Sequence, residues 1–202
     1  MRLLATNRAL TLTYLRFAMT TLCMYTVLYG LTQWLEASRG VSAREAGLLL
    51  LPMTGLAVVV VLPTFRHNVV RLPLITAAIS CLAASVGVVF LITSTPIVSM
   101  VIVTLVFGIT FGTTSIGNQT ALYSQVTADQ IGTAAGLLRS FGYLGSIASA
   151  AMISVVFHTE VDDRGMHMIG WIMVVVSAIG LAALLTDRSI VGRRVSTKAS
   201  RR

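Results

Sequence analysis

Long apolar runs dominate the chain and are separated by short polar breaks. A hydrocarbon core about 30 Å thick is crossed by about 20 apolar residues, because a helix rises about 1.5 Å per residue. Runs of this length are expected at Leu12 to Trp34, Ala46 to Phe65, Leu72 to Thr93, Ile97 to Gly117, Ile131 to Phe157 and Met168 to Leu185. The pattern therefore predicts an all-α membrane protein with a bundle of six transmembrane helices.

The composition agrees with the lipid bilayer as the main solvent. The chain is 55% hydrophobic and only 11% charged, whereas soluble domains are roughly 25% charged. We expect residues 1–186 to form the transmembrane bundle. Residues 187–202 are predicted to be a basic, disordered cytoplasmic tail.

Basic residues are distributed unevenly between the two ends of the predicted spans. One end carries Arg2, Arg8, Arg66, Arg71 and six Lys or Arg residues of the tail, whereas the other carries Arg39, Arg44 and Arg164. Because Lys and Arg mark the cytoplasmic side, both termini are predicted to be cytoplasmic in a multi-pass protein of the plasma membrane. The net charge of +8 is therefore attributed to anchoring near anionic lipid, and no nucleic-acid partner is predicted.

Polar residues are distributed unequally among the spans. The first span carries Thr21, Tyr25, Tyr29 and Gln33 at intervals of four, which places them on one helical face. Such a stripe either lines a wet cavity or supplies interhelical hydrogen bonds and interfacial aromatic rings, and the sequence leaves both open. The third and sixth spans carry little beyond Ser, Thr and Gly, so they are expected to face lipid.

Small residues recur four positions apart in the fourth and fifth spans. Gly108 and Gly112 form one such pair, and Gly132 and Gly136 form another. This spacing lets helix backbones approach closely in lipid. We therefore expect the fourth and fifth spans to pack tightly, with the glycines serving packing and not substrate contact.

The fifth span contains a charged residue. This span is predicted to begin near Ala128, because Thr127 and Gln130 have the spacing of a capping box. Arg139 then lies about 12 Å of helix rise from the cytoplasmic end, where a charge is costly unless it is paired, hydrated or able to snorkel. The spans hold no acidic residue, so its counter-charge is expected from substrate, water, backbone carbonyls or another chain. Arg16 lies nearer the interface and is expected to snorkel.

The sequence shows no catalytic constellation. The outer hairpin from His158 to His167 is acidic, but such hairpins are usually solvated loops, and no metal site is predicted there. Trp34 and Trp171 lie at span ends on this same side, as interfacial indoles prefer. The chain has no phosphate-binding loop, HExxH, GxSxG or CxxC motif. It is therefore not expected to be an enzyme.

Three segments resemble a known transporter family. They are NRALTLTYLR leading into the first span, GLTQWLEASRGVSAREAGLLLLPM from Gly30 to Met53, and GTAAGLLRSFGYLG from Gly132 to Gly145. Together they resemble the fourteen-span drug:proton antiporter branch of the major facilitator superfamily, and the resemblance extends to Leu185. It implies the C-terminal six-helix half of such a transporter, built from two inverted three-helix repeats.

The resemblance also implies a substrate cavity lined by the first, second, fourth and fifth spans. Its substrates would be small amphipathic or cationic compounds, moved outward in exchange for protons. The implied substrate-cavity residues are Tyr25, Tyr29, Gln33, Thr114, Asn118 and Arg139. No cofactor is implied, because the proton gradient would supply the energy.

The chain departs from the family pattern in three ways. Phe65 to Arg71, between the second and third spans, keeps basic charge but lacks the Asp and the glycines of the family's cytoplasmic loop. The antiporter signature belongs to the other half of the family's proteins. The spans also contain no carboxylate, and Arg139 stands where the branch often has an uncharged polar residue. Proton coupling is therefore not assigned to this chain, and the preferred substrate charge stays open.

The expected function is a part of a secondary active transporter that works by alternating access. Its partner would be a missing N-terminal half, either a separate polypeptide or lost by truncation, or a second copy of this chain. The alternative is a non-transporting remnant or a regulatory membrane subunit.

Overall fold

The structure is a computed structural model that describes residues 8–64 and 71–187. Throughout this part of the chain the regular elements are helices, and no strand is present, which confirms the all-α prediction. They are α2 (Arg8–Thr26), the π-helix η1 (Val27–Leu31), α3 (Thr32–Arg39), α4 (Ala43–Thr64), α5 (Arg71–Val89), α6 (Ile97–Tyr123), the 3-10 helix η2 (Ala128–Gln130), α7 (Ile131–Val156) and α8 (Asp163–Thr186).

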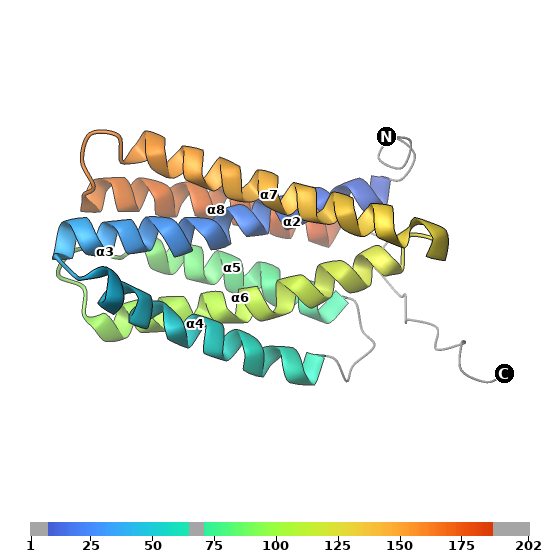
Figure 1. Ribbon diagram of the computed structural model, residues 1–202, viewed down its shortest axis with the longest axis horizontal. Coiled ribbons are helices and arrows are strands. Elements are labelled where there is room, and N and C mark those ends of the chain that lie inside the picture. Colours follow the sequence, from blue (N-terminus) through green and yellow to red (C-terminus); the bar gives the residue numbers. More distant parts are fainter. Residues whose placement is uncertain (1–7, 65–70, 188–202) are drawn as a thin grey trace.

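The helices run along the long axis of an elongated bundle (Figure 1). α2, η1 and α3 follow one another without a break, so they form one long rod. Four segments are long and apolar enough to cross a membrane: Ala43–Val61, Arg71–Val89, Ile97–Tyr123 and Asp163–Thr186. These four support a membrane protein. The count of six spans stays a prediction, because α2 and α7 fall outside this group.

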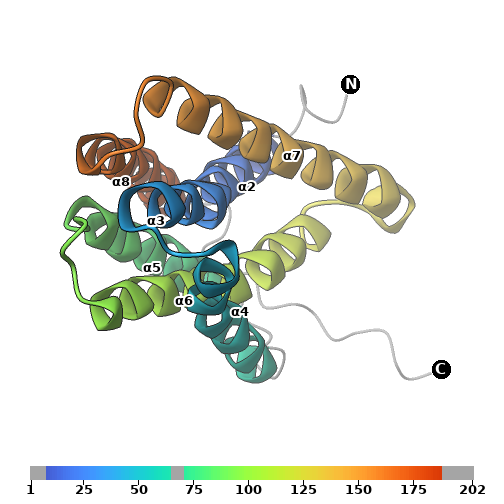
Figure 2. The same cartoon turned by 60° about the vertical axis from the view of Figure 1, so that its left-hand side comes forward.

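The main helix pairs are α4 with α6, α2 with α7, and α5 with both α6 and α8. Figure 2 shows α4 and α7 at opposite edges of the bundle, with α2 and α6 between them. The expected tight packing of the fourth span against the fifth is therefore wrong, because α6 and α7 each use another helix as their main partner. Local small-residue spacing identifies a helix that can approach closely, but it does not identify the partner.

The glycines show these partners directly. A Cβ added at Gly108 would lie 2.5 Å from the backbone oxygen of Met53, and one at Gly112 would lie 2.5 Å from that of Ala57. Both acceptors are on α4. Gly132 and Gly136 have the same spacing on α7, yet an added Cβ meets nothing within 4 Å at either. Only the first of the two predicted pairs is a packing motif within this bundle.

Gly145 supplies the matching close approach of α7 to α2. An added Cβ there would collide with the backbone oxygen of Ala18 and the hydroxyl of Thr21. At Gly142 an added Cβ would lie 2.7 Å from the ring of Phe17. The glycines of α6 and α7 thus allow each helix to approach the backbone of its partner closely.

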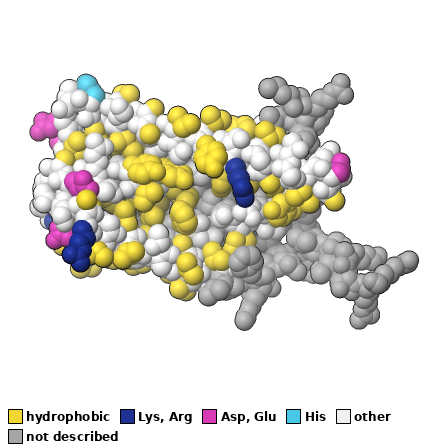
Figure 3. Space-filling view, in the orientation of Figure 1, with side chains coloured by type: hydrophobic (Ala, Val, Ile, Leu, Met, Phe, Trp, Pro, Cys, Tyr) yellow, Lys and Arg dark blue, Asp and Glu magenta, His cyan; other side chains and the backbone are white. Residues whose placement is uncertain are grey.

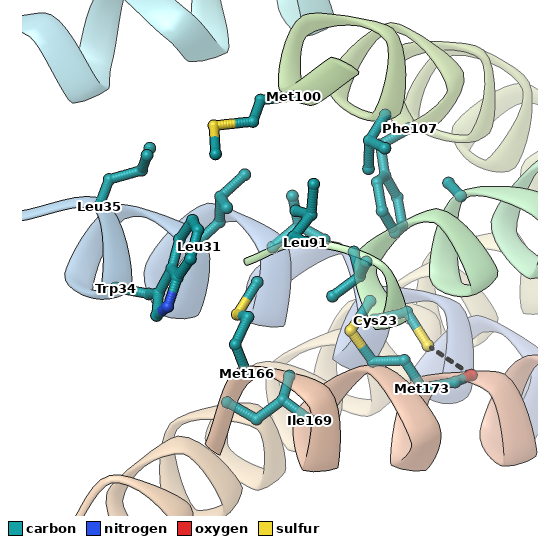
Figure 4. Packing of buried hydrophobic residues seen from close by; sticks show 14 of the residues in the cluster. Cys23, Leu31, Trp34, Leu35, Leu91, Met100, Phe107, Met166, Ile169 and Met173 are labelled. Atoms are coloured by element: carbon teal, nitrogen blue, oxygen red, sulfur yellow. Dashed lines mark hydrogen bonds between the residues drawn. The ribbon is translucent and has the colours of Figure 1, made fainter. Parts of the chain in front are cut away.

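The largest buried cluster lies toward the end of the bundle that carries the α7–α8 connection, where large apolar side chains from several helices meet. Figure 4 shows Trp34 of α3, Met100 of α6, and Met166 and Ile169 of α8 in this cluster. The two cysteines, Cys23 and Cys81, are buried and free. The Cys23 thiol donates a hydrogen bond of 3.9 Å to the backbone oxygen of Met173 (Figure 4).

Trp34 corrects one sequence prediction. Its side chain is 0% exposed, and Nε1 donates a hydrogen bond of 3.1 Å to Asp163 Oδ1. The indole is therefore a core residue that finds its polar partner inside the bundle, and not an interfacial residue. Trp171 is 60% exposed, but it lies eight residues after the start of α8 at Asp163, so its interfacial position stays a prediction.

The α7–α8 connection, predicted to lie outside the cell, is held by hydrogen bonds. Asp163 also accepts bonds from the backbone nitrogen and the hydroxyl of Thr93, at 2.9 and 2.7 Å. Asp162 caps α8 by accepting from Gly165 N at 2.7 Å. Ser38 Oγ donates to Val161 O at 2.7 Å. Asp163 thus joins α3, the α5–α6 connection and α8. The described residues contain no group of three His, Cys, Asp or Glu side chains that could hold a metal ion.

The predicted capping box is absent, and another helix start carries one. Thr127 makes no side-chain cap, although η2 does begin at the predicted Ala128. A reciprocal capping box occurs instead at the start of α4, where Ser42 N donates to Glu45 Oε2 at 3.0 Å and Glu45 N donates to Ser42 Oγ at 3.4 Å.

Candidate functional site

One broad face of the bundle is formed by α7, the α2–η1–α3 rod, α6 and α4, and it faces the viewer in Figure 1. Figure 3 shows this face as largely apolar and uncharged, with acidic side chains only near its two ends and a basic side chain in its interior part. The helices of this face correspond to the first, second, fourth and fifth predicted spans, which the resemblance implies as the lining of a substrate cavity. The sequence-predicted residues can therefore be located relative to it.

Tyr25, Tyr29 and Gln33 lie on the helical rod. The rings of Tyr25 and Tyr29 are stacked with centroids 5.6 Å apart. Tyr29 is 50% exposed and Gln33 is exposed, whereas Thr21 is buried against α7. Positions four apart wind around an α-helix by about 40° per step, and Tyr29 itself lies in η1. The predicted stripe consequently runs from a buried packing position at Thr21 to an exposed position at Gln33.

The π-helix η1 is a feature that the sequence did not indicate. It occupies Val27–Leu31 in the middle of the rod and contains Gly30. π-helical turns inside longer helices are rare and occur often at functional sites. Here the turn carries Tyr29, so a local change in helix geometry coincides with a candidate residue.

Arg139 lines a recess of about 90 Å³ between α6, α7 and α2. Its side chain is exposed. The remaining lining residues are Phe17, Ser115, Gln119, Leu122, Tyr123, Ala135 and Leu138. Arg139, Gln119, Ser115 and Tyr123 give the recess polar groups, whereas Phe17, Leu122 and Leu138 give it an apolar wall. The sequence identified the arginine, but not the polar side chains that accompany it.

Thr114 and Asn118 lie on α6 but face the interior. They are 2% and 3% exposed, and Asn118 Nδ2 donates to Thr114 O at 2.9 Å. Among the described residues, Thr114 Oγ1 and Asn118 Oδ1 have no hydrogen-bond partner. Asn118 lines a separate cavity of about 30 Å³ between α2, α5, α6 and α8. The six candidate residues therefore do not form one cluster in this bundle.

Arg16 lines the same interior cavity and corrects another prediction. Arg16 Nη1 lies 3.2 Å from Asp187 Oδ2, with side-chain exposures of 6% and 4%. Nη2 also donates to Thr13 Oγ1 at 3.3 Å. The expected snorkelling is wrong, because the guanidinium turns inward to a carboxylate that follows α8. Sequence reasoning missed this pair because Asp187 lies just beyond the last apolar run.

The opposite side of the bundle is apolar and exposed. On α5 the exposed large side chains include Leu72, Ile79 and Val86, and on α8 they include Val175 and Ile179. Their spacing of seven or four residues places those of each helix on one face. This arrangement is what the expected lipid-facing role of the third and sixth spans requires.

Some sequence predictions lie outside the described residues. The basic loop between the second and third spans falls almost entirely at residues 65–70, and the predicted tail, residues 187–202, falls at 188–202 except for Asp187. Asp187 is buried, so the tail prediction is wrong at its first residue. Arg2 and Arg66, which contributed to the predicted orientation, belong to the same undescribed parts of the chain.

Comparison with known proteins gives one informative relative. No family model matches the chain. The chain is 26% identical over 198 residues to YwoD of Bacillus subtilis strain 168, described as an uncharacterized MFS-type transporter. The alignment covers 93% of this chain but only 44% of the relative, so the chain spans less than half of that protein's length. The chain is therefore similar over most of its length to part of an MFS-type transporter, and its long apolar helices support a membrane protein.

Proposed function

We propose that this chain forms one half of a secondary active transporter, in which a second helical bundle packs over the face formed by α2, α4, α6 and α7. The observation that carries the proposal is the alignment of 93% of the chain with less than half of an MFS-type transporter. A bundle of that extent supplies one wall of a central pathway, and alternating access then consists of rocking one bundle against the other.

The helix packing supports two inverted three-helix repeats. The first repeat would contain the α2–η1–α3 rod, α4 and α5, and the second would contain α6, α7 and α8. Exchanging the repeats turns the α4–α6 contact into the α7–α2 contact, and both are main contacts of the bundle. Each is closed by glycines, Gly112 against Ala57 and Gly145 against Ala18. The exchange thus relates the two helix pairs, although in both pairs the glycine lies on the helix of the second repeat.

The partner bundle is either an N-terminal half or a second copy of this chain. An N-terminal half is favoured, because the relative has more than twice the aligned length. We propose a plasma-membrane location in which the start of α2 and the end of α8 lie on the cytoplasmic side. This orientation rests on the distribution of Lys and Arg.

Coupling to protons and outward movement of small amphipathic compounds rest on the resemblance. On the face formed by α2, α4, α6 and α7, Figure 3 shows acidic side chains only near the ends. A proton-binding carboxylate in the middle of the pathway would therefore belong to the partner bundle. This chain would contribute the aromatic pair Tyr25 and Tyr29, Gln33 and the Arg139 recess to the pathway.

The test is solute flux by the purified chain in proteoliposomes, prepared with and without a co-expressed N-terminal bundle. We expect the chain to purify as a complex with that bundle, and the complex to move an amphipathic solute only when a pH gradient is imposed. Ethidium and 1-naphthoate serve as cationic and anionic solutes. A chain that stays monomeric and gives no flux with either solute under any gradient contradicts the proposal and favours a non-transporting or regulatory subunit.

A further inference from the structure

Arg139 is a cation without a partner in the described part of the chain. It lies eight residues after the start of α7 at Ile131, which corresponds to about 12 Å of helix rise. The hydrogen bonds and ion pairs formed by the described residues do not include it. A guanidinium at this depth is costly unless an anion or water accompanies it. The structure therefore leaves Arg139 available to an anion from outside the bundle.

The polar neighbours of Arg139 in the recess offer hydrogen-bond donors. Gln119 Nε2 donates to Ser115 Oγ at 3.4 Å, so the Ser115 hydroxyl keeps its own hydrogen for another acceptor. Tyr123 is 49% exposed and adds a phenol hydroxyl. Ser115, Gln119 and Tyr123 are four residues apart, which puts these groups on one side of α6.

Acidic groups lie away from the recess. Among the described residues, Glu36, Glu45 and the three carboxylates of the outer hairpin lie toward the outer end, and Asp129 lies in η2 at the opposite end. Asp187 already pairs with Arg16. Asp129 is ten residues from Arg139, roughly 15 Å along the helix axis. The bundle therefore gives the recess a positive charge without a neutralising carboxylate.

We propose that the recess binds the carboxylate of a small amphipathic organic anion, so that the bundle handles anionic and not cationic solutes. This inference rests on the proposed function, since it assigns the substrate class of the same pathway. A carboxylate accepts paired bonds from a guanidinium and from nearby hydroxyl and amide donors. The apolar side chains Phe17, Leu122 and Leu138 line the same recess and would contact the apolar part of the solute.

The size and depth of the recess favour a solute over a lipid headgroup. Its volume of about 90 Å³ accommodates a carboxylate and the adjoining part of a ring, and leaves the rest of the solute to the larger pathway. Arg139 also lies deeper along its helix than the interfacial zone where headgroups reside. An organic cation would meet the unneutralised charge of Arg139 and be repelled.

The experiment measures binding to the full chain in phosphatidylcholine nanodiscs, without a gradient. Equilibrium dialysis compares 1-naphthoate with 1-naphthylmethylammonium, which has a similar ring system and the opposite charge. We expect 1-naphthoate to bind at least tenfold more tightly. Arg139→Ala should weaken its binding about tenfold to hundredfold, because a hydrogen-bonded charge pair is lost. Arg139→Lys should retain part of the affinity, since it keeps the charge but not the planar fork.

Arg164→Ala is the matched control, because it removes an exposed arginine from the start of α8, far along the chain from the recess. It should leave 1-naphthoate binding unchanged. Equal losses in Arg164→Ala and Arg139→Ala, or tighter binding of the ammonium, overturn the proposal. A fall in 1-naphthoate binding when phosphatidylglycerol is added, seen with Arg139 but not with Arg139→Ala, assigns the site to lipid and also overturns it. Flux of ethidium alone would refute the anion site while leaving the transporter proposal intact.

Discussion

Replacing Gly112 with alanine tests the packing of α4 on α6. The added Cβ would lie 2.5 Å from the Ala57 backbone oxygen and 3.2 Å from its Cα, whereas ordinary contact begins at 3.4 Å. The helices must therefore separate by about 0.9 Å, the difference between 3.4 and 2.5 Å. The obstacle is backbone, which cannot rotate away as a side chain can. Overpacking of this kind typically costs about 1–3 kcal/mol, and we expect that loss of unfolding free energy in Gly112→Ala.

Gly136→Ala is the matched control, since this glycine also belongs to a pair spaced four apart. An added Cβ there meets nothing within 4 Å. Alanine is favoured over glycine inside a helix by about 1 kcal/mol. We therefore expect Gly136→Ala to leave the free energy of unfolding unchanged or to raise it by up to about 1 kcal/mol.

The assay is reversible unfolding in mixed detergent micelles with increasing SDS, followed by helical circular dichroism. The two variants should move the unfolding midpoint in opposite directions, or Gly112→Ala alone should lower it. Gly108→Ala, whose added Cβ would lie 2.5 Å from the backbone oxygen of Met53, should behave like Gly112→Ala. Equal midpoints for Gly112→Ala and Gly136→Ala would refute the assignment of α4 as the partner of α6.

Three further changes test the polar contacts. Arg16→Ala removes the buried ion pair with Asp187 and should cost about 3–5 kcal/mol in the same SDS titration. Asp187→Ala added to it should recover part of this loss, and a double variant less stable than the single one contradicts the pairing. Ser42→Ala removes the cap of α4 and should lower the free energy of unfolding by about 0.5–2 kcal/mol. The thermal unfolding midpoint should fall, and an unchanged midpoint contradicts the role of Ser42 as a cap. Asp163→Ala leaves the Trp34 indole nitrogen without its acceptor, which should lower the free energy of unfolding by about 1–3 kcal/mol. With the other tryptophan replaced by Phe, the Trp34 fluorescence should shift to longer wavelength. Unchanged emission contradicts this contact.

The helices themselves were predictable because they depend on local patterns. Apolar runs about 20 residues long mark where a backbone must satisfy its own hydrogen bonds in lipid, and each predicted run overlaps an observed helix. The ends were predicted less well. α8 begins at Asp163, ahead of the predicted Met168, because Asp162 caps it and Asp163 bonds to Thr93. Polar residues at a helix start do not register as part of an apolar run.

The tertiary partners were not predictable, since they depend on residues distant in the sequence. Arg16 and Asp187 are 171 positions apart, and Trp34 reaches Asp163 across 129 positions. The same limit applies to the candidate site. Polarity singled out Arg139 and Asn118, but only the packing of the helices directs Arg139 to a surface recess and Asn118 to an interior cavity.

The most direct test of the account is the water accessibility of Ser115 in the assembled protein. Ser115→Cys places a thiol in the recess, and Val175→Cys places one on the exposed apolar face of α8. Cys23 and Cys81 are first replaced by alanine, and a water-soluble methanethiosulfonate reagent then measures the reactivity of each new thiol in the membrane. If the face formed by α2, α4, α6 and α7 borders a transport pathway, the thiol at 115 reacts and 1-naphthoate protects it, while the thiol at 175 stays unreactive in lipid. Equal, low reactivity at both positions would contradict the claim that this face lines a pathway for solutes.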